Sequence, residues 1–302
     1  ANEFLTEEEA EAVETAEEGN SIPLTVFEVP ATIDFKLATR FDKILYDNMI
    51  MTDVNGLLTV KDEGVTMTDF QISILQGLVT LNGTYETTNP VRPTVNFDLD
   101  IKDFDIPQTF ETFNTVQKLA PITESCVGKF STSLKFVAEL DEHMNPDLNT
   151  LTGGGRVTTN EVFIEGSETI DKLADLLNND KYKRMKIEDV KATYEFIDGR
   201  LHVKPFEVKV EKSTATVYGS NGFDETLDYT LDMKVPTSEL GSDINALLGD
   251  LLSLTNSGGA NFKTPDVIEV QVKITGTCSD PKVSLGNLNA LGSGGTVKEQ
   301  IV

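Results

Sequence analysis

The chain has 302 residues, of which 39% are hydrophobic, so it is long enough for one large domain or two modest ones with an ample core. Fifty Asp and Glu residues against 25 Lys and Arg give a net charge of −25, which argues against nucleic-acid binding and against electrostatic docking on anionic lipid headgroups. No apolar run approaches the length that spans a bilayer.

The first residues are strongly acidic. Residues 1–20 carry eight Glu and no basic residue, so residues 1–21 predict an acidic disordered linker, with an acidic interaction tail as the alternative. The chain begins at Ala1 rather than Met, which is compatible with an N-terminal signal or anchor that lies outside this sequence.

Short strands follow from Pro23 onward, separated by predicted turns at Asn55-Gly56, Glu63-Gly64, Gln76-Gly77 and Asn82-Gly83. Asp198-Gly199 lies between two apolar runs and predicts a tight hairpin, because Gly readily adopts the positive φ that such turns need. Apolar and polar residues alternate in the strands, which gives each strand one apolar and one polar face and indicates antiparallel pairing. Two sets of apolar positions show the alternation most clearly: Val95, Phe97, Leu99 and Ile101, and Leu227, Tyr229, Leu231 and Met233.

The strand pattern occurs twice, which predicts a duplicated architecture. Asp53-Val54 opens the first copy and Asp189-Val190 opens the second. In each copy an alternating strand leads to an apolar–proline pair, then an amphipathic segment, then a returning strand that closes on a proline, Pro146 or Pro281. We expect a first β-rich repeat over residues 22–166, a second over residues 167–290, and a flexible tail over residues 291–302.

Three segments change to the helical period of 3.6 residues. They span residues 107–120, 168–178 and 238–254, and each has one apolar stripe. The sequence therefore predicts an α+β fold that is predominantly antiparallel β. We expect an elongated curved sheet built from two homologous repeats, with the amphipathic helices on its apolar face.

The sequence contains no motif for catalysis, a metal or a cofactor, so we expect neither enzymatic activity nor a bound cofactor. His143 and His202 are predicted to be surface residues. Asp98 and Asp100 are interpreted as the polar face of a strand rather than as a calcium site. A carboxylate pair that meets only in space, as in a glycan hydrolase, stays open as an alternative. Cys126 and Cys278 are compatible with one disulfide or with two free thiols.

The chain resembles the C-terminal region of the AsmA-like proteins over about residues 22–290. The resemblance consists of strand-and-turn motifs without a catalytic signature: Ile33-Asp34-Phe35-Lys36, Phe41-Asp42-Lys43-Ile44-Leu45-Tyr46, Met51-Thr52-Asp53-Val54-Asn55-Gly56, Ile72-Ser73-Ile74-Leu75-Gln76-Gly77, Val79-Thr80-Leu81-Asn82-Gly83, Asp198-Gly199-Arg200-Leu201, Pro205-Phe206, Leu227-Asp228-Tyr229, Ile274-Thr275-Gly276-Thr277 and Asp280-Pro281-Lys282-Val283. It implies a periplasmic protein of the Gram-negative envelope, attached to a membrane through a segment not present in this chain, that supports outer-membrane assembly and lipid transport along a hydrophobic groove.

Two interpretations of the apolar alternation follow. In one, the helices cover the apolar sheet face and form an ordinary core, which the residues alone slightly favour. In the other, the face is a groove for lipid acyl chains, because burial stabilises by roughly 25 cal/mol per Å2 of apolar area. With the resemblance we expect acyl-chain binding, lined by the eight alternating residues named above. The alternative is an interaction scaffold whose sheet edges pair with envelope proteins, without lipid binding.

Overall fold

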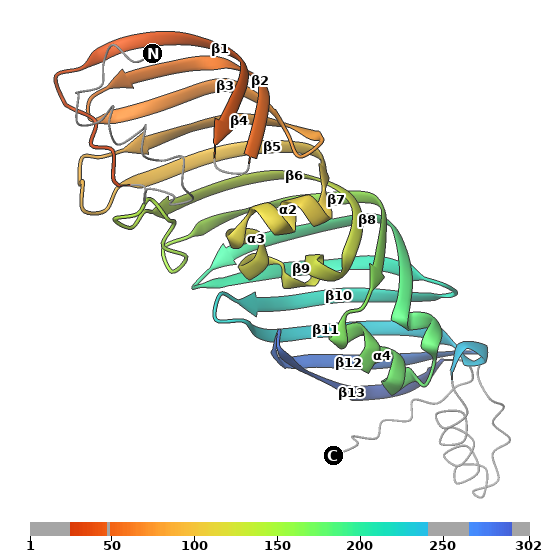
Figure 1. Ribbon diagram of the computed structural model, residues 1–302. Helices are drawn as coiled ribbons and strands as arrows, with labels where there is room; N and C mark the ends of the chain where they lie inside the picture. The colour runs from red at the N-terminus through yellow and green to blue at the C-terminus, as the bar shows by residue number, and fades with distance from the viewer. Residues whose placement is uncertain (1–24, 47–48, 241–265, 292–302) are drawn as a thin grey trace, which may run out of the picture.

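The computed structural model describes residues 25–46, 49–240 and 266–291. In this part of the chain, thirteen strands form one curved, unclosed sheet in which each strand pairs antiparallel with the next strand in sequence (Figure 1). The predominantly antiparallel prediction is therefore confirmed. The strands are β1 Asp34–Tyr46, β2 Met49–Lys61, β3 Gly64–Ile74, β4 Gly77–Glu86, β5 Thr94–Asp105, β6 Cys126–Glu139, β7 Thr152–Glu165, β8 Arg184–Ile197, β9 Arg200–Val210, β10 Ser213–Gly222, β11 Thr226–Pro236, β12 Val267–Thr277 and β13 Asp280–Leu291.

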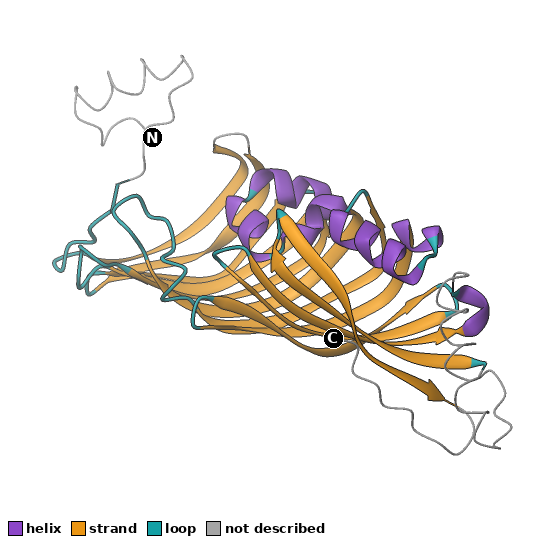
Figure 2. Ribbon diagram, turned by 90° about the horizontal axis from the view of Figure 1, so that it is seen from below, coloured by secondary structure: helices purple, strands orange, loops and turns teal. Residues whose placement is uncertain are grey.

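Helices lie on the concave side of the sheet (Figure 2). Between β5 and β6 the chain forms α2 Ile106–Thr112, α3 Asn114–Leu119 and the 3-10 helix η3 Pro121–Ser125. Between β7 and β8 it forms α4 Glu168–Leu177 and η4 Asp180–Lys183, and η5 Thr237–Glu239 follows β11.

The predicted helix over residues 107–120 is divided in two. The Asp105 side chain caps α2 by accepting a 3.0 Å hydrogen bond from the Gln108 amide, and Pro107 occupies the first turn. Phe113 then adopts an extended backbone, with φ −114° and ψ 103°, which ends α2 before α3 begins. Apolar periodicity persists across this break, so the periodicity alone could not locate it.

The second predicted helix is confirmed as α4, which ends where Asn178 adopts the left-handed conformation at φ 49°. The predicted helix over 238–254 lies outside the described residues except at its start, where η5 occurs. The predicted linker over 1–21 and nearly all of the predicted tail over 291–302 are also outside them. β7 and β8, on either side of the predicted repeat boundary, pair as continuously as other neighbours do, and the division into two repeats stays a prediction.

The strands bend at bulges that share a sequence pattern. Asp53, Asp69 and Asp103 have φ between 50° and 55°, and the strand register shifts beside each of them. An aspartate tolerates this left-handed conformation better than most residues because its short polar side chain can bond locally. A buried apolar residue follows each one, so the bend turns an apolar side chain inward while it increases the local twist of the strand.

The core comprises two clusters of buried side chains. The larger one joins the apolar stripe of α4, including Leu173 and Leu177, to strands β7–β12. The smaller one joins Val29, which precedes β1, and the loop around Leu140 to the ends of β4–β6 and β8. The smaller cluster covers its part of the concave face only partly, and the candidate site lies there.

Candidate functional site: an apolar trough

One row of directly paired residues crosses the whole sheet on its concave face without a single charge. Residues directly opposite each other in antiparallel strands point to the same face. Twelve successive strand pairings at roughly 4.8 Å each make this row about 58 Å long. From β1 to β13 the row reads Leu37, Leu58, Met67, Gly83, Phe97, Phe136, Gly153, Phe196, Leu201, Asn221, Leu227, Gly276 and Pro281. We call this surface and its flanking rows the trough.

The trough contains both predicted sets of alternating residues. Phe97 and Leu227 belong to the row just described, and Leu99 is connected to Tyr229 through an adjacent row of the same kind. The register of the sheet therefore brings together two sets that are about 130 residues apart in sequence.

Burial differs between the two sets. In β11, Leu231 and Met233 are buried in the larger core cluster, and Leu227 and Tyr229 pack against that cluster. In β5, Val95 is buried beneath the neighbouring loops, whereas Phe97, Leu99 and Ile101 are half-buried. Surface for a ligand is therefore concentrated in the N-terminal part of the trough.

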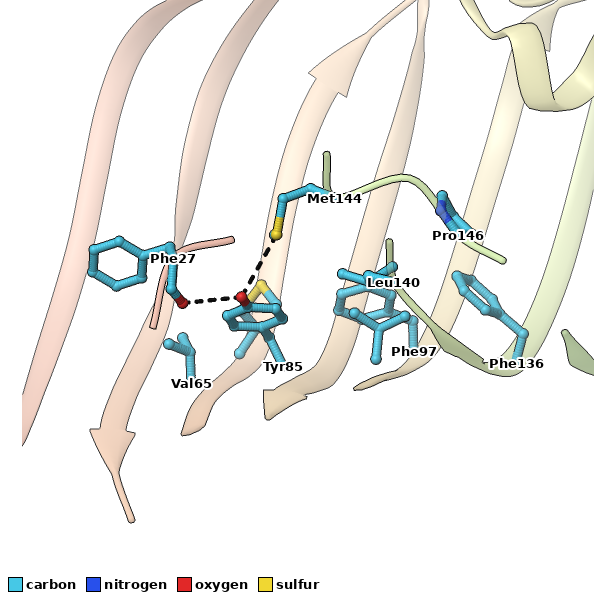
Figure 3. A pocket seen from close by; sticks show the side chains of 10 residues that line it. Phe27, Val65, Tyr85, Phe97, Phe136, Leu140, Met144 and Pro146 are labelled. Atoms are coloured by element: carbon cyan, nitrogen blue, oxygen red, sulfur yellow. Dashed lines mark hydrogen bonds between the residues drawn. The ribbon is translucent and has the colours of Figure 1, made fainter. Parts of the chain in front are cut away.

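A cleft of about 460 Å3 opens in this part of the trough (Figure 3). Strands β3–β6 supply its floor, and two loops supply its rim. Apolar residues dominate the lining: Phe27, Val65, Met67, Tyr85, Val95, Phe97, Phe136, Leu140, Met144 and Pro146. The single hydroxyl in the lining belongs to Tyr85, so the cleft favours an apolar ligand.

Hydrogen bonds hold the rim of the cleft in place. The Tyr85 hydroxyl donates to the Phe27 carbonyl at 2.9 Å and lies 3.5 Å from the Met144 sulfur (Figure 3). Burial raises the pKa of Tyr85 above its usual range, so it remains a donor at neutral pH. Nearby, the Val29 amide donates to the Thr87 hydroxyl at 2.9 Å, and that hydroxyl donates to the Glu63 carbonyl.

Beyond the cleft the trough remains open as far as β1. The side chains of Phe35, Leu37 and Phe41 on β1 are 46–48% exposed. Leu58 and Leu81, on the strands between β1 and β5, are half-buried. Contiguous apolar surface of this kind is uncommon on soluble proteins and marks interaction sites.

The α2–α3 segment closes the trough near its middle. It leaves β5, and the Leu119 carbonyl at the end of α3 accepts a 3.0 Å hydrogen bond from the Asn221 side chain on β10. Asn221 in turn accepts from the Tyr229 hydroxyl at 2.8 Å. This contact joins segments 102 residues apart and fixes the helices over β6–β9 (Figure 1). The one polar side chain of the long row thus serves as the anchor for this cover.

Glycines in the trough make room for aromatic rings. A Cβ at Gly83 would lie 2.1 Å from Phe97 Cδ1, and a Cβ at Gly56 would lie 2.4 Å from Phe70 Cδ2. Each ring therefore lies over a glycine of a neighbouring strand. Turn chemistry predicts turns at Asn55-Gly56 and Asn82-Gly83, but both pairs lie inside strands, and this prediction is wrong. The predicted hairpin turn at Asp198-Gly199 is correct.

The titratable groups that the sequence singles out do not assemble in the trough. His143 is exposed beside Glu142, and His202 is half-buried on the convex face. Asp98 is also on the convex face, 2.6 Å from Lys135 Nζ. Both cysteines are free, and burial raises the pKa of the Cys126 thiol to about 11.

Among the described residues, no group of three or more His, Cys, Asp or Glu side chains is arranged to hold a metal ion. Within those same residues, no helix is long and apolar enough to cross a membrane.

Comparisons with known proteins add no relative: no protein-family model, curated protein or solved structure matches the chain. The trough and its lining are therefore the basis for a functional proposal.

Sequence reasoning missed the contribution of β1–β4 to the trough, although Phe35 and Leu37 already alternate with Asp34 and Lys36. It also missed the two rim loops, whose contacts are between residues distant in sequence.

Proposed function

We propose that this chain is the non-enzymatic periplasmic portion of an AsmA-like envelope protein, and that its trough shelters lipid acyl chains during outer-membrane biogenesis. The observation that carries the proposal is the apolar floor that runs uncharged from Leu37 to Phe136 and is only partly covered. An acyl chain lying across the strands gains about 0.8 kcal/mol for each methylene that it buries.

The division of the trough suggests where the acyl chain lies. Strands β7–β12 already pack in the α4 cluster, so the chain occupies the section from β1 to β6. Phe97, Leu99 and Ile101 are its proposed contacts in β5. Val95 is buried beneath loops, and Leu231 and Met233 are buried in the α4 cluster, so these three are not proposed as contacts of the acyl chain.

The two-repeat architecture belongs to the same proposal. In it, each homologous repeat contributes one half of the trough, and amphipathic helices cover the apolar face wherever an acyl chain does not. Asp53-Val54 and Asp189-Val190 support the equivalence of the halves, because both aspartates have a positive φ, 53° and 54°, inside a strand.

The proposal is tested with a photoactivatable fatty acid. The full chain is incubated with the probe, irradiated and digested, and the modified peptides are identified by mass spectrometry. We expect labels on β1–β6 and on the rim residues Phe27 and Met144, together with co-purifying lipid in native mass spectra. A protein that carries no lipid and is labelled no more in these strands than on the convex face would refute the proposal.

A further inference from the structure

The outer edge of β1 has no neighbouring strand among the described residues. β1 is 13 residues long and pairs on its other side with β2 through twelve residue pairs. An edge strand of this length presents a row of backbone donors and acceptors to which another extended segment can pair. It contains neither a proline nor a register shift that would prevent such pairing.

The concave side of this edge also lacks cover. Phe35, Leu37 and Phe41 are nearly half exposed, whereas the apolar residues that follow along the same rows are half-buried or buried. A strand added beside β1 would supply apolar neighbours to all three and would continue the trough by one strand.

The convex side indicates the charge of the missing neighbour. Within the sheet, cations on one strand meet carboxylates directly opposite them on the next: Lys135 lies 2.6 Å from Asp98, and Arg184 pairs with Glu165. Direct opposition of unlike charges stabilises a strand pair, whereas like charges oppose pairing. The same rule applied to β1 predicts the partner.

Two cations of β1 have no carboxylate opposite them on a neighbouring strand. Lys36 and Arg40 are exposed and alternate with Leu37 and Phe41, which places them on the convex face. In the described part of the chain neither forms an ion pair, although Asp34 at the start of the same strand does so with Lys61. Asp34 and Asp42 flank them on the same face, and Asp34 already pairs with Lys61, so Lys36 and Arg40 are the cations on this face of the edge that lack an ion-pair partner among the described residues.

We propose that the outer edge of β1 binds an extended segment of a partner protein in which apolar and acidic side chains alternate. Its backbone adds a fourteenth strand to the thirteen of the sheet. Its apolar side chains continue the trough, and its carboxylates lie opposite Lys36 and Arg40. The proposal does not depend on lipid binding, because strand addition and acyl-chain binding use different contacts.

A peptide with the sequence of β5, Thr94–Asp105, is a suitable probe because it alternates Phe97, Leu99 and Ile101 with acidic residues. Its fluorescein-labelled form is titrated with the full chain and followed by anisotropy. A second peptide carries lysine in place of Asp98 and Asp100. We expect saturable binding of the acidic peptide, at least tenfold weaker binding of the lysine peptide, and slower hydrogen exchange of the β1 amides in the complex.

Reversing the charges of Lys36 and Arg40 tests whether the peptide binds at the outer edge of β1. The double variant Lys36→Glu with Arg40→Glu should weaken binding of the acidic peptide at least tenfold. The matched control reverses Lys191 and Lys209, two exposed convex-face lysines of interior strands, and should bind as the unchanged protein does. Circular dichroism melting curves establish that both variants are folded.

Three results would overturn the proposal. The first is equal binding of both peptides, or binding that the edge variant leaves unchanged. The second is a dimer of the protein alone that the edge variant abolishes, which would assign the edge to a second copy of this chain. The third is peptide binding that appears only after the eight Glu of residues 1–20 are changed to Gln, which would assign the edge to this chain's own acidic segment.

Discussion

Replacement of Leu99 by Asp tests whether the apolar floor of the trough binds a ligand or is only part of the core. Leu99 lies in the middle of β5, half-buried, with Leu81 and Leu134 directly opposite it on the neighbouring strands. No charged residue occupies these opposite positions, so the new carboxylate would have no partner on the concave face. It would face the space that the acyl chain is proposed to fill.

The expected loss of affinity follows from two routes. If the carboxylate keeps its hydration shell, roughly three methylenes of the acyl chain lose contact with the floor, at about 0.8 kcal/mol each. If the chain remains in place, the carboxylate is desolvated, which costs several kcal/mol for an unpaired charge. Either route weakens binding by about 2–3 kcal/mol, which corresponds to roughly 30- to 150-fold in the dissociation constant.

The assay is displacement of a fluorescent fatty acid, with Asn96→Asp as the matched control. Asn96 is an exposed residue of the same strand on the convex face, so this variant adds the same charge without changing the trough. Leu99→Asp should lose affinity, and Asn96→Asp should retain it. If both bind alike while circular dichroism shows both folded, the ligand does not touch the floor at Leu99, and the assignment of the trough is refuted.

Three further outcomes follow from local packing and protonation. Leu177→Ala should lower the free energy of unfolding in urea by about 2–5 kcal/mol, because this fully buried side chain leaves a cavity in the α4 cluster. Burial raises the pKa of the Cys126 thiol to about 11, so Cys126 should react with iodoacetamide more slowly than the half-buried Cys278. For the same reason the free energy of unfolding should fall as the pH rises from 9.0 to about 11, because the Cys126 thiol ionises in the unfolded chain before it ionises in the folded one. Thr87→Val should cost about 1–3 kcal/mol and speed proteolysis before β1, because the Val29 amide loses its acceptor.

The antiparallel sheet could be predicted from the sequence because its signal is local. Alternation in β5 and β11 identifies the apolar face of each strand, and a pair such as Asp198-Gly199 specifies a turn through its own backbone preferences. The prediction fails at Asn55-Gly56 and Asn82-Gly83, where glycine is required by the ring of a neighbouring strand. A sequence does not show which aromatic residue will face a given glycine.

The candidate site was predictable only in part, for a related reason. Phe97 and Leu227 could be assigned to apolar faces, but their shared row depends on the register of every strand between them. The difference in burial between Phe97 and Leu227 depends on which helices and loops pack over each of them. The hydrogen bond from Asn221 to Leu119, which holds the cover of the trough, joins residues with no sequence pattern in common.

The open section of the trough requires a cover that the described residues do not provide. Helix α4 buries four apolar residues in the cluster with β7–β12, and the loop around Leu140 covers the start of β5, yet Phe35 and Leu37 on β1 remain nearly half exposed. Leaving such a surface in water forgoes stabilisation of roughly 25 cal/mol per Å2.

The two proposed covers divide this surface between them. An acyl chain lies over the floor from Leu37 to Phe136, whereas an added strand pairs with the outer backbone edge of β1. Leu99→Asp should therefore leave peptide binding intact, and reversal of Lys36 and Arg40 should leave fatty-acid binding intact. Loss of both activities in either variant, with the fold preserved, would mean that edge and floor form a single site with one occupant.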